Sequence, residues 1–417
     1  MTMDYWLYVH PYVYVSSIKD RTILYNTIDG KLLEYDNRNM GKIARLIKRL
    51  NSDSNLYVIG ITEKDIDEDV RQFIEDLRKY YLGDIIDKRH RPHRPIQLKP
   101  LLSLQRTFDY LTTGQGQSKI LTRDELPNYL NVITLHINDV CGESCSFCCK
   151  AYKQFVCCDR GQRGEISVEL LKKLLEQTRN SRLYKLNITG GNIFRHSCFR
   201  EIVNILDGVE HKKEYYIHYK NIEDFQFLNG ENNRLFIIVH FPVDVNELNR
   251  SLEILKRLGI EKKFRFIVQE MDDIQKAYDM IASLKVKEAE LIPYFNGGNW
   301  DFFNQKVFLD KDSIIQARPG MKSILARMTI NTWDFKKLTV FGNGDVFANL
   351  NYPAIGNLNR DHIFDLVERE LNHGKSWTKA RRHVKPCKSC VFNALCPPIS
   401  NYEYTLRRYN LCNIDLS

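Results

Sequence analysis

The sequence predicts an α/β protein with a central parallel sheet of six strand–helix units, a small α+β unit before it and a cysteine-rich extension after it. Between about 129 and 300, short apolar strands alternate with amphipathic helices at the pitch of βα units. The first 95 or so residues instead begin with aromatic and β-branched segments and continue with helical periodicity. Cysteines gather at two places, one inside the central region and one near its far end. Six units rather than eight favour a partial barrel.

Residues 1–95 are expected to form one compact unit. Three strands are predicted, at Trp6–Val15, Ile23–Thr27 and Lys31–Tyr35, with a turn at Asp29-Gly30. A first helix follows, and Thr62 is the predicted N-cap of a second helix, with Asp65 three residues later. The two helices each present one apolar face, formed by Ile43, Leu46, Ile47 and Leu50 and by Ile66, Val70, Phe73, Ile74 and Leu77.

Residues 96–128 are interpreted as a linker. The basic run Lys88–Pro95 before it has regularly spaced prolines and no apolar periodicity, which is typical of an exposed hinge. An electrostatic grip on an acidic peptide or on nucleic acid is the alternative interpretation.

The central region, 129–300, alternates strands and helices. Strands are predicted at Val132–Ile137, Leu183–Ile188, Glu214–Tyr219, Leu235–His240, Phe264–Val268 and Ala289–Pro293. Helices are predicted at Ser167–Arg179, Asn246–Leu258 and Ile274–Leu284, among others. Right-handed crossovers would bring the strand carboxyl ends to one edge, where the site is expected.

The first cysteine group follows the first of these strands. Cys141, Cys145 and Cys148 spell C-x3-C-x2-C, with the aromatic Phe147 before the last cysteine. Three thiolates can hold three irons of a [4Fe–4S] cluster and leave the fourth iron open. Thiolates at this spacing would also bind zinc, which is the alternative.

This loop resembles the cluster loop of the radical SAM enzymes. The resemblance implies that S-adenosylmethionine chelates the open iron and is split to a 5′-deoxyadenosyl radical. The second strand ends in Thr189-Gly190-Gly191-Asn192, which is similar to the glycine-rich motif by which that family binds the cofactor's amino group. Asn192 stands where the motif usually has glutamate, so an acceptor is kept and a charge is lost. Phe147 and these four residues are the expected cofactor-binding set.

The last region, 301–417, contains a predicted β-hairpin around Gly342–Asp345, a helix near Ile363–Leu371 and a second cysteine group. Cys387, Cys390, Cys396 and Cys412 could hold a [4Fe–4S] cluster, zinc or neither. The region resembles the SPASM/twitch-like extension of radical SAM peptide maturases. That pattern, C-x(9–15)-G-x4-C before C-x2-C-x5-C-x3-C and a final C, holds two auxiliary clusters.

The departures from that pattern are coherent. Gly344 is present, but both cysteines of the first segment are absent, with Asn349 in the second place, and Ser400 occupies the x3-C position. These positions ligate one auxiliary cluster in the family, and the four retained cysteines ligate the other. The resemblance therefore implies one auxiliary [4Fe–4S] cluster.

Residues 1–95 are similar in layout to the winged-helix-like domain that binds leader peptides in peptide-modifying enzymes, where the leader adds a strand to a sheet edge. A decorating or dimerisation unit is the alternative. The resemblances together predict an enzyme that crosslinks, forms a thioether in, or epimerises a ribosomally made peptide. Its expected partners are a precursor peptide with a leader and an electron donor, with a partner maturase as a further candidate. A non-catalytic pseudo-radical-SAM partner of an active maturase is the main alternative, and radical modification of RNA is a weaker one.

Composition sets the remaining expectations. The 417 residues are 43% hydrophobic and 27% charged, which is ordinary for a globular protein, and no apolar run approaches a membrane span. Eleven cysteines in two groups suit a reducing compartment with metal ligands, so a cytoplasmic location is expected. The net charge of +9 is modest, and no nucleic-acid module is evident. Cys149, Cys157, Cys158 and Cys198 are interpreted as free thiols, Cys157 and Cys158 alternatively as groups near the substrate, and His240 as a core histidine or a nucleoside contact.

Overall fold

The structure is a computed structural model of the whole chain. It describes residues 4–99, 123–143, 145, 147–159, 161, 163–223, 228 and 230–414. Most of the predicted linker therefore lies outside the described residues. No helix in the described part of the chain is long and apolar enough to cross a membrane.

A nine-stranded sheet forms the centre of the protein, with strand order β12-β11-β10-β9-β8-β7-β13-β14-β15. The first six of these strands are parallel and neighbours in chain order: β7 Val132–His136, β8 Lys185–Thr189, β9 Lys212–His218, β10 Asn233–His240, β11 Glu261–Val268 and β12 Ala289–Pro293. This confirms the predicted α/β class and the six parallel strands.

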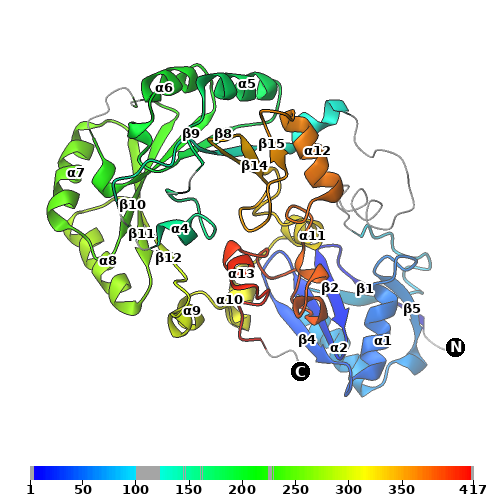
Figure 1. Cartoon of the computed structure of the whole chain (residues 1–417). Coiled ribbons are helices and arrows are strands. Elements are labelled where there is room, and N and C mark those ends of the chain that lie inside the picture. The colour runs from blue at the N-terminus through cyan, green and yellow to red at the C-terminus, as the bar shows by residue number, and fades with distance from the viewer. Residues whose placement is uncertain are drawn as a thin grey trace.

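Helices connect these strands. They are α4 Cys148–Ala151, α5 Val168–Thr178, α6 Phe199–Asp207, α7 Val245–Arg257 and α8 Met271–Ser283. The four longer ones lie along the outer side of the curved sheet, whereas α4 lies on its inner side (Figure 1). Apolar strand and helix faces between the layers form the largest core, which is why the helical stripes in the sequence point inward.

The sheet continues into the last region, which the sequence did not indicate. β13 Lys337–Phe341 pairs in parallel with β7, from Lys337 opposite Val132 to Phe341 opposite His136. The predicted hairpin is confirmed, because β14 Asp345–Phe347 pairs antiparallel with β13 and then with β15 Gly356–Asn357. The helices of this region are α9 Trp300–Lys306, α10 Lys311–Gln316, α11 Met321–Thr329, α12 Ile363–His373 and α13 Asn401–Leu406.

The first region contains two three-stranded antiparallel sheets and two helices. One sheet has the order β5-β1-β6 and the other β2-β3-β4. The elements are β1 Asp4–Val9, β2 Val13–Ile18, β3 Arg21–Asn26, β4 Leu32–Asp36, α1 Gly41–Leu50, β5 Val58–Thr62, α2 Glu68–Lys79 and β6 Gly83–Asp87. The buried faces of α1 and α2 contain the predicted apolar residues, although Ile66 lies just before α2.

Two local predictions in this region are wrong. The expected strand Trp6–Val15 is broken by a turn in which Val13 N donates to His10 O, and its halves join different sheets. Thr62 does not cap the second helix: its backbone and hydroxyl donate to Asp65 within a short 3-10 turn, and Asp67 caps α2 by accepting from Val70 N. Strand β5 also separates the two helices, whereas the sequence predicted a hairpin followed by helices alone.

Part of the basic run Lys88–Pro95, which follows β6, contacts the sheet β5-β1-β6 instead of lying in solvent. The Lys88 ammonium lies 4.4 Å from the Trp6 ring centre, and Trp6 Nε1 donates to Arg91 O. Arg94 also donates to Val58 O at 3.0 Å. The run is therefore partly docked on β1 and β5.

Candidate metal centres

The predicted cluster loop leads from β7 to α4 on the inner side of the sheet. Cys141 and Cys145 are half-buried, and Cys148 is buried at the first position of α4. The thiols of Cys145 and Cys148 are hydrogen-bonded to each other, and this bond together with burial raises the pKa of Cys145. Cys141 is near enough for its charge to act on Cys148. Cys145 and Cys148 therefore contact each other, and Cys141 lies in the same loop before them.

Phe147 anchors this loop. Its side chain is 1% exposed and packs edge-on against His240 and Tyr294, with ring centres 4.9 and 5.9 Å away. Ile238 and Ile267 of the sheet belong to the same apolar cluster. Phe147 therefore fixes the loop through burial, and its expected contact with a cofactor stays a prediction.

The Gly190-Gly191 pair lets this loop approach the end of β8. A Cβ at Gly191 would lie 2.3 Å from Val140 O, and one at Gly190 would lie 2.6 Å from Asn138 Oδ1. Gly191 N donates to Asn138 O at 3.0 Å. The sequence predicted a close approach of backbone to a ligand at this pair, and the structure shows a close approach to the segment immediately before Cys141.

The flanking residues Thr189 and Asn192 already have protein partners. Thr189 Oγ1 donates to Cys157 O at 2.9 Å, and Asn192 Oδ1 accepts from Phe194 N at 3.1 Å. Asn192 N also donates to Val140 O at 2.6 Å. All five expected cofactor residues thus lie close to the cysteine loop, while their binding of a cofactor is untested.

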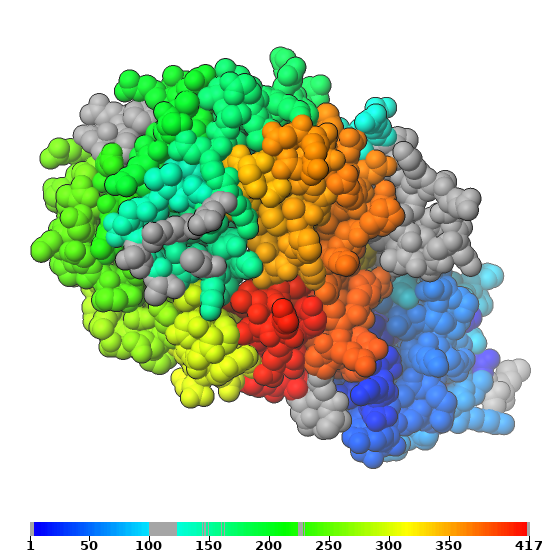
Figure 2. Space-filling view, viewed as in Figure 1, coloured from blue at the N-terminus to red at the C-terminus, as the bar shows by residue number. Residues whose placement is uncertain are grey.

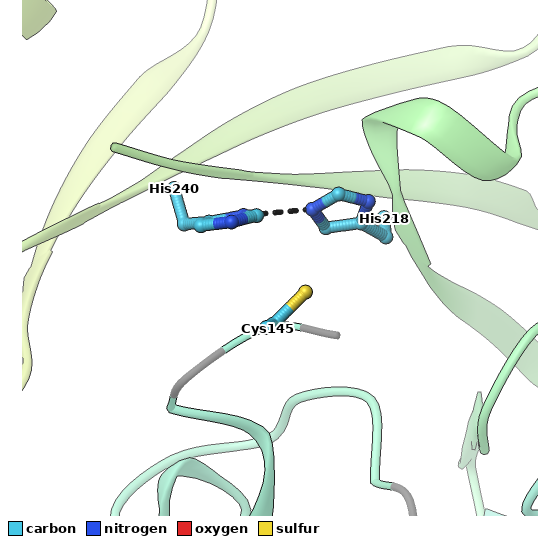
Figure 3. Close-up of side chains that lie close together, drawn as sticks. All are labelled: Cys145, His218 and His240. Carbon is cyan, nitrogen blue, oxygen red and sulfur yellow. Dashed lines mark hydrogen bonds between the residues drawn. The ribbon is translucent and has the colours of Figure 1, made fainter. Parts of the chain in front are cut away.

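Two histidines complete this site. His218 and His240 lie at the ends of the adjacent strands β9 and β10, and His218 Nε2 is 2.8 Å from His240 Nδ1. Their donor atoms and Cys145 Sγ all lie within 4.8 Å of one another (Figure 3). Burial, followed by His240, lowers the pKa of His218 to about 3, so its imidazole is neutral.

Sequence reasoning considered His240 but missed His218. The available signal was that both end neighbouring parallel strands, whose carboxyl ends meet at one edge. Thiol and neutral imidazole donors suit iron–sulfur or zinc chemistry, so the donor set fits the expected metal group.

The four cysteines of the last region also converge. Cys387, Cys390, Cys396 and Cys412 line one small cavity, together with Arg381. Cys387 Sγ lies 3.0 Å from Tyr409 O and accepts a hydrogen bond from Arg381 Nη1 at 3.6 Å. Four thiols that line one cavity match the number and type of donors of a fully ligated cluster or a structural zinc ion.

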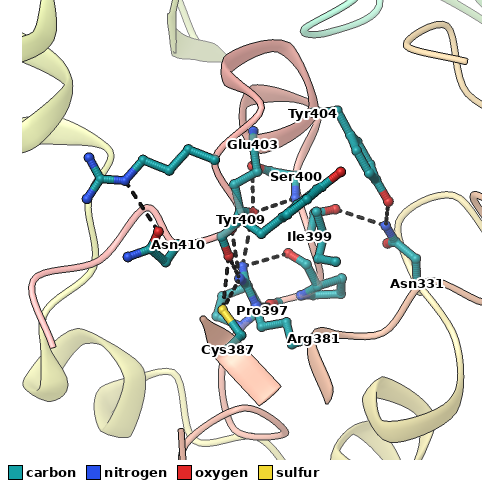
Figure 4. Close-up of polar contacts among 12 residues, drawn as sticks. Asn331, Arg381, Cys387, Pro397, Ile399, Ser400, Glu403, Tyr404, Tyr409 and Asn410 are labelled. Carbon is teal, nitrogen blue, oxygen red and sulfur yellow. Dashed lines mark hydrogen bonds and ion pairs between the residues drawn. The ribbon is translucent and has the colours of Figure 1, made fainter. Parts of the chain in front are cut away.

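Arg381 is a residue that sequence reasoning missed. It is buried and forms two hydrogen bonds with Glu403, at 2.7 and 3.0 Å, and further bonds with the carbonyls of Pro397 and Tyr409 (Figure 4). Burial raises the pKa of Cys387, whereas the Arg381 cation opposes that rise. Arg381 therefore favours the thiolate form that a metal needs.

The positions of the absent cysteines meet at a polar cluster. Asn349 Nδ2 donates to Asp334 Oδ2 at 3.0 Å and to Asn401 Oδ1 at 2.7 Å. Ser400, next to Asn401, is the N-cap of α13. Nine residues separate Asp334 from Gly344, a spacing that the pattern allows for its first cysteine. Carboxylate and amide groups thus occupy the region where the resemblance would place another cluster.

A cavity of about 910 Å³ is lined by the polar cluster and by residues near both cysteine groups, although by none of the cysteines themselves. Its walls include Gln154 and Phe155 directly after α4, Asp334 and Asn349 of the polar cluster, and Arg381 beside the second cysteine group. Residues at the start of α13 form part of this wall, and the space-filling view shows this segment (red) beside the yellow segment that contains α9 (Figure 2). A cavity of this volume is at the upper end for small-molecule sites and has room for part of a peptide.

Comparisons with known proteins give no family. No family model matches the chain, and no curated protein matches it. Among solved structures, SuiB of Streptococcus suis aligns over 98% of this chain and 100% of its own, with 12% identity and a TM-score of 0.49. SuiB bound to its precursor peptide SuiA aligns over 97% of this chain and 98% of its own, with 14% identity and a TM-score of 0.48. SuiB bound to S-adenosylmethionine aligns over 97% of this chain and 97% of its own, with 12% identity and a TM-score of 0.45. Values this low establish no shared activity.

Proposed function

We propose that this protein is a radical SAM enzyme that modifies a ribosomally made peptide. The observation that carries the proposal is the meeting of the cysteine loop and the Gly190-Gly191 turn at the carboxyl ends of β7 and β8. The adjoining cavity extends from the segment after α4 to the second cysteine group. Both groups would then border one substrate.

In this proposal Cys141, Cys145 and Cys148 hold a [4Fe–4S] cluster with one open iron, and Phe147 and Thr189–Asn192 surround S-adenosylmethionine. Bound together, these two groups supply a 5′-deoxyadenosyl radical that can take a hydrogen atom from a substrate C–H bond. Cys387, Cys390, Cys396 and Cys412 hold one auxiliary cluster. The chain's own contribution is to orient the substrate, to exclude water and to keep both clusters ligated.

Residues 1–95 are proposed to bind the leader of the precursor peptide, with 96–128 as linker, 129–300 as radical SAM domain and 301–417 as auxiliary cluster domain. The support is that both sheets of the first region end in edge strands, to which an extended peptide can add. The modification made, the electron donor, a partner maturase and the cytoplasmic location stay predictions.

The test is anaerobic reconstitution followed by incubation with S-adenosylmethionine and a reductant. We expect about eight irons per chain, as two four-iron clusters require, and release of 5′-deoxyadenosine. Replacing Cys141, Cys145 and Cys148 with alanine should halve the iron and abolish 5′-deoxyadenosine. A colourless preparation, or unchanged behaviour of the triple variant, would refute the proposal.

A non-catalytic partner of an active maturase is the second candidate. It is favoured by Asn192, whose side-chain oxygen already accepts a hydrogen bond from Phe194 N and carries no charge for a cofactor amino group. This candidate predicts bound iron without 5′-deoxyadenosine, together with co-purification of a related maturase.

A further inference from the structure

Cys158, interpreted from the sequence as a free thiol or a group near the substrate, lies beside the cluster loop. It is 2% exposed and belongs to the apolar cluster that contains Phe147, Tyr216 and Phe236. A thiol in this position is shielded from solvent and cannot act as a surface nucleophile. Any role of Cys158 therefore depends on the polar side chains that it contacts inside the protein.

Those neighbours are other thiols. Cys158 is hydrogen-bonded to Cys148, which is in turn hydrogen-bonded to Cys145. Cys157 lies on its other side, with the two sulfurs 3.8 Å apart. Cys158 thus extends the row of loop thiols by one sulfur donor, and Cys157 lies one step further away.

The backbone holds Cys158 in this place. Cys157 O accepts the Thr189 hydroxyl at 2.9 Å, and Asp159 N donates to Gly190 O at 2.8 Å. The residues on both sides of Cys158 are therefore tied to the end of β8, which also supports the loop before Cys141. The loop and Cys158 share one scaffold.

We propose that Cys158 is a fourth thiolate donor of the metal site formed by Cys141, Cys145 and Cys148. Soft sulfur donors on a shared scaffold are what an iron–sulfur cluster selects, and four thiolates complete its protein ligation. The resting site would then be closed. The open iron of the proposed function would then form only on cofactor binding. Cys158 would leave the iron as the amino and carboxylate groups of S-adenosylmethionine bind, and would take up the proton that the amino group gives up, with no electron transferred.

The inference rests on the proposed function only in that the loop binds a metal. The histidine pair is the competing source of a fourth ligand, since it lies within 4.8 Å of Cys145 Sγ. His240 contacts Cys145 as Cys158 contacts Cys148, so contact does not separate the two candidates. Cys158 is favoured by donor type, because iron–sulfur clusters are held mainly by thiolates.

The experiment compares the wild type, Cys158→Ala and the matched control Cys157→Ala after anaerobic reconstitution. An iron without a protein ligand is lost on mild oxidation, which leaves a three-iron cluster with its own electron paramagnetic resonance signal. We expect little of this signal from the wild type and from Cys157→Ala, and a several-fold larger signal from Cys158→Ala. Cys158→Val, which nearly preserves the side-chain volume, replaces the alanine variant should that one fail to fold.

An equally large signal from all three proteins would overturn the proposal, as would an equally small one. If the reconstituted wild type takes up zinc and no iron, the proposed function fails, but the role of Cys158 is still decided. Zinc affinity should then fall at least about tenfold in Cys158→Ala and stay unchanged in Cys157→Ala; equal affinities would contradict the assignment.

Discussion

At the scale of single residues, Asp334 is a buried ionisable group in the wall of the cavity. Burial raises its pKa to about 7, although Ser376 and Asn349 donate hydrogen bonds to it and oppose the rise. The Lys337 cation also lowers the pKa of Asp334, whereas the Glu370 carboxylate raises it. Because an unfolded aspartate titrates near 3.9, the folded chain holds the extra proton between about pH 4 and pH 7. Stability from this group is therefore present below pH 4 and lost as pH rises through 7.

Asp334→Asn should remove this pH dependence. Asparagine keeps an acceptor oxygen for the same donors and carries no charge, so the variant should be more stable than the wild type at pH 8. The gap should reach about 2–4 kcal/mol and shrink toward zero near pH 4. Urea unfolding at several pH values measures it, with exposed Asp312→Asn as control. A constant gap across pH would contradict the raised pKa.

Gly191 makes a second residue-scale prediction. A methyl group at this position meets Val140 O, so Gly191→Ala must displace the backbone just before Cys141, at a cost of about 1–3 kcal/mol. Iron bound after reconstitution should fall from about eight toward about four per chain, because only the first site is disturbed. Gly259→Ala is the control, since a Cβ there would meet nothing within 4 Å. Full iron binding by Gly191→Ala would show that the close approach is unimportant.

At the scale of elements, strands and helices followed from local patterns, but their long-range pairing did not. The six strands of the central region were predictable because buried parallel strands are short apolar runs between amphipathic helices. The pairing of β13 with β7 joins segments about two hundred residues apart, and nothing in either segment encodes it. The break between β1 and β2 had a signal that the prediction overlooked, because Pro11 stands at the second position of the turn closed by His10 O and Val13 N, where proline is favoured.

The candidate sites divide in the same way. Closely spaced cysteines indicate a metal site in the sequence, so Cys141, Cys145 and Cys148 could be predicted as ligands. Cys158, His218, Arg381 and Asp334 join their sites only through folding, and each looks ordinary in its own segment. Two signals could have been used: the spacing of Asp334 before Gly344, and the place of His218 at the end of the strand beside that of His240.

Arg381 and Glu403 form a buried ion pair that ties the segment before Cys387 to α13, with side chains 9% and 1% exposed. Arg381→Met leaves the Glu403 carboxylate buried without its cation, so we expect a loss of about 3–5 kcal/mol in unfolding free energy. Adding Glu403→Gln should restore part of it, because the uncompensated charge is gone. Thermal unfolding of the single and double variants tests this. A double variant as unstable as the sum of both single variants would show that charge burial is not the cause.

At the scale of the whole molecule, the first region packs directly on the second cysteine group. Ile23 and Tyr25 of β3 share one apolar cluster with Phe392, Leu395 and Cys390. The figure shows the same contact, with the sheet of β2 and β4 against the C-terminal segments (Figure 1). The proposed leader-binding region therefore supports the wall of the proposed auxiliary site, and disturbing one should loosen the other.

Ile23→Ala and Ile43→Ala separate this coupling from general instability. Both side chains are fully buried in the first region, so each truncation should cost about 2–4 kcal/mol. Ile43 packs within that region's own core, whereas Ile23 faces the segment that carries Cys390. Iron release to a chelator should therefore be several-fold faster from the second site in Ile23→Ala alone, because its ligands lose their packed support. Equal rates of iron release from the two variants would mean that packing of the first region does not support the auxiliary site. A peptide bound to the first region could then not influence the auxiliary cluster through this contact.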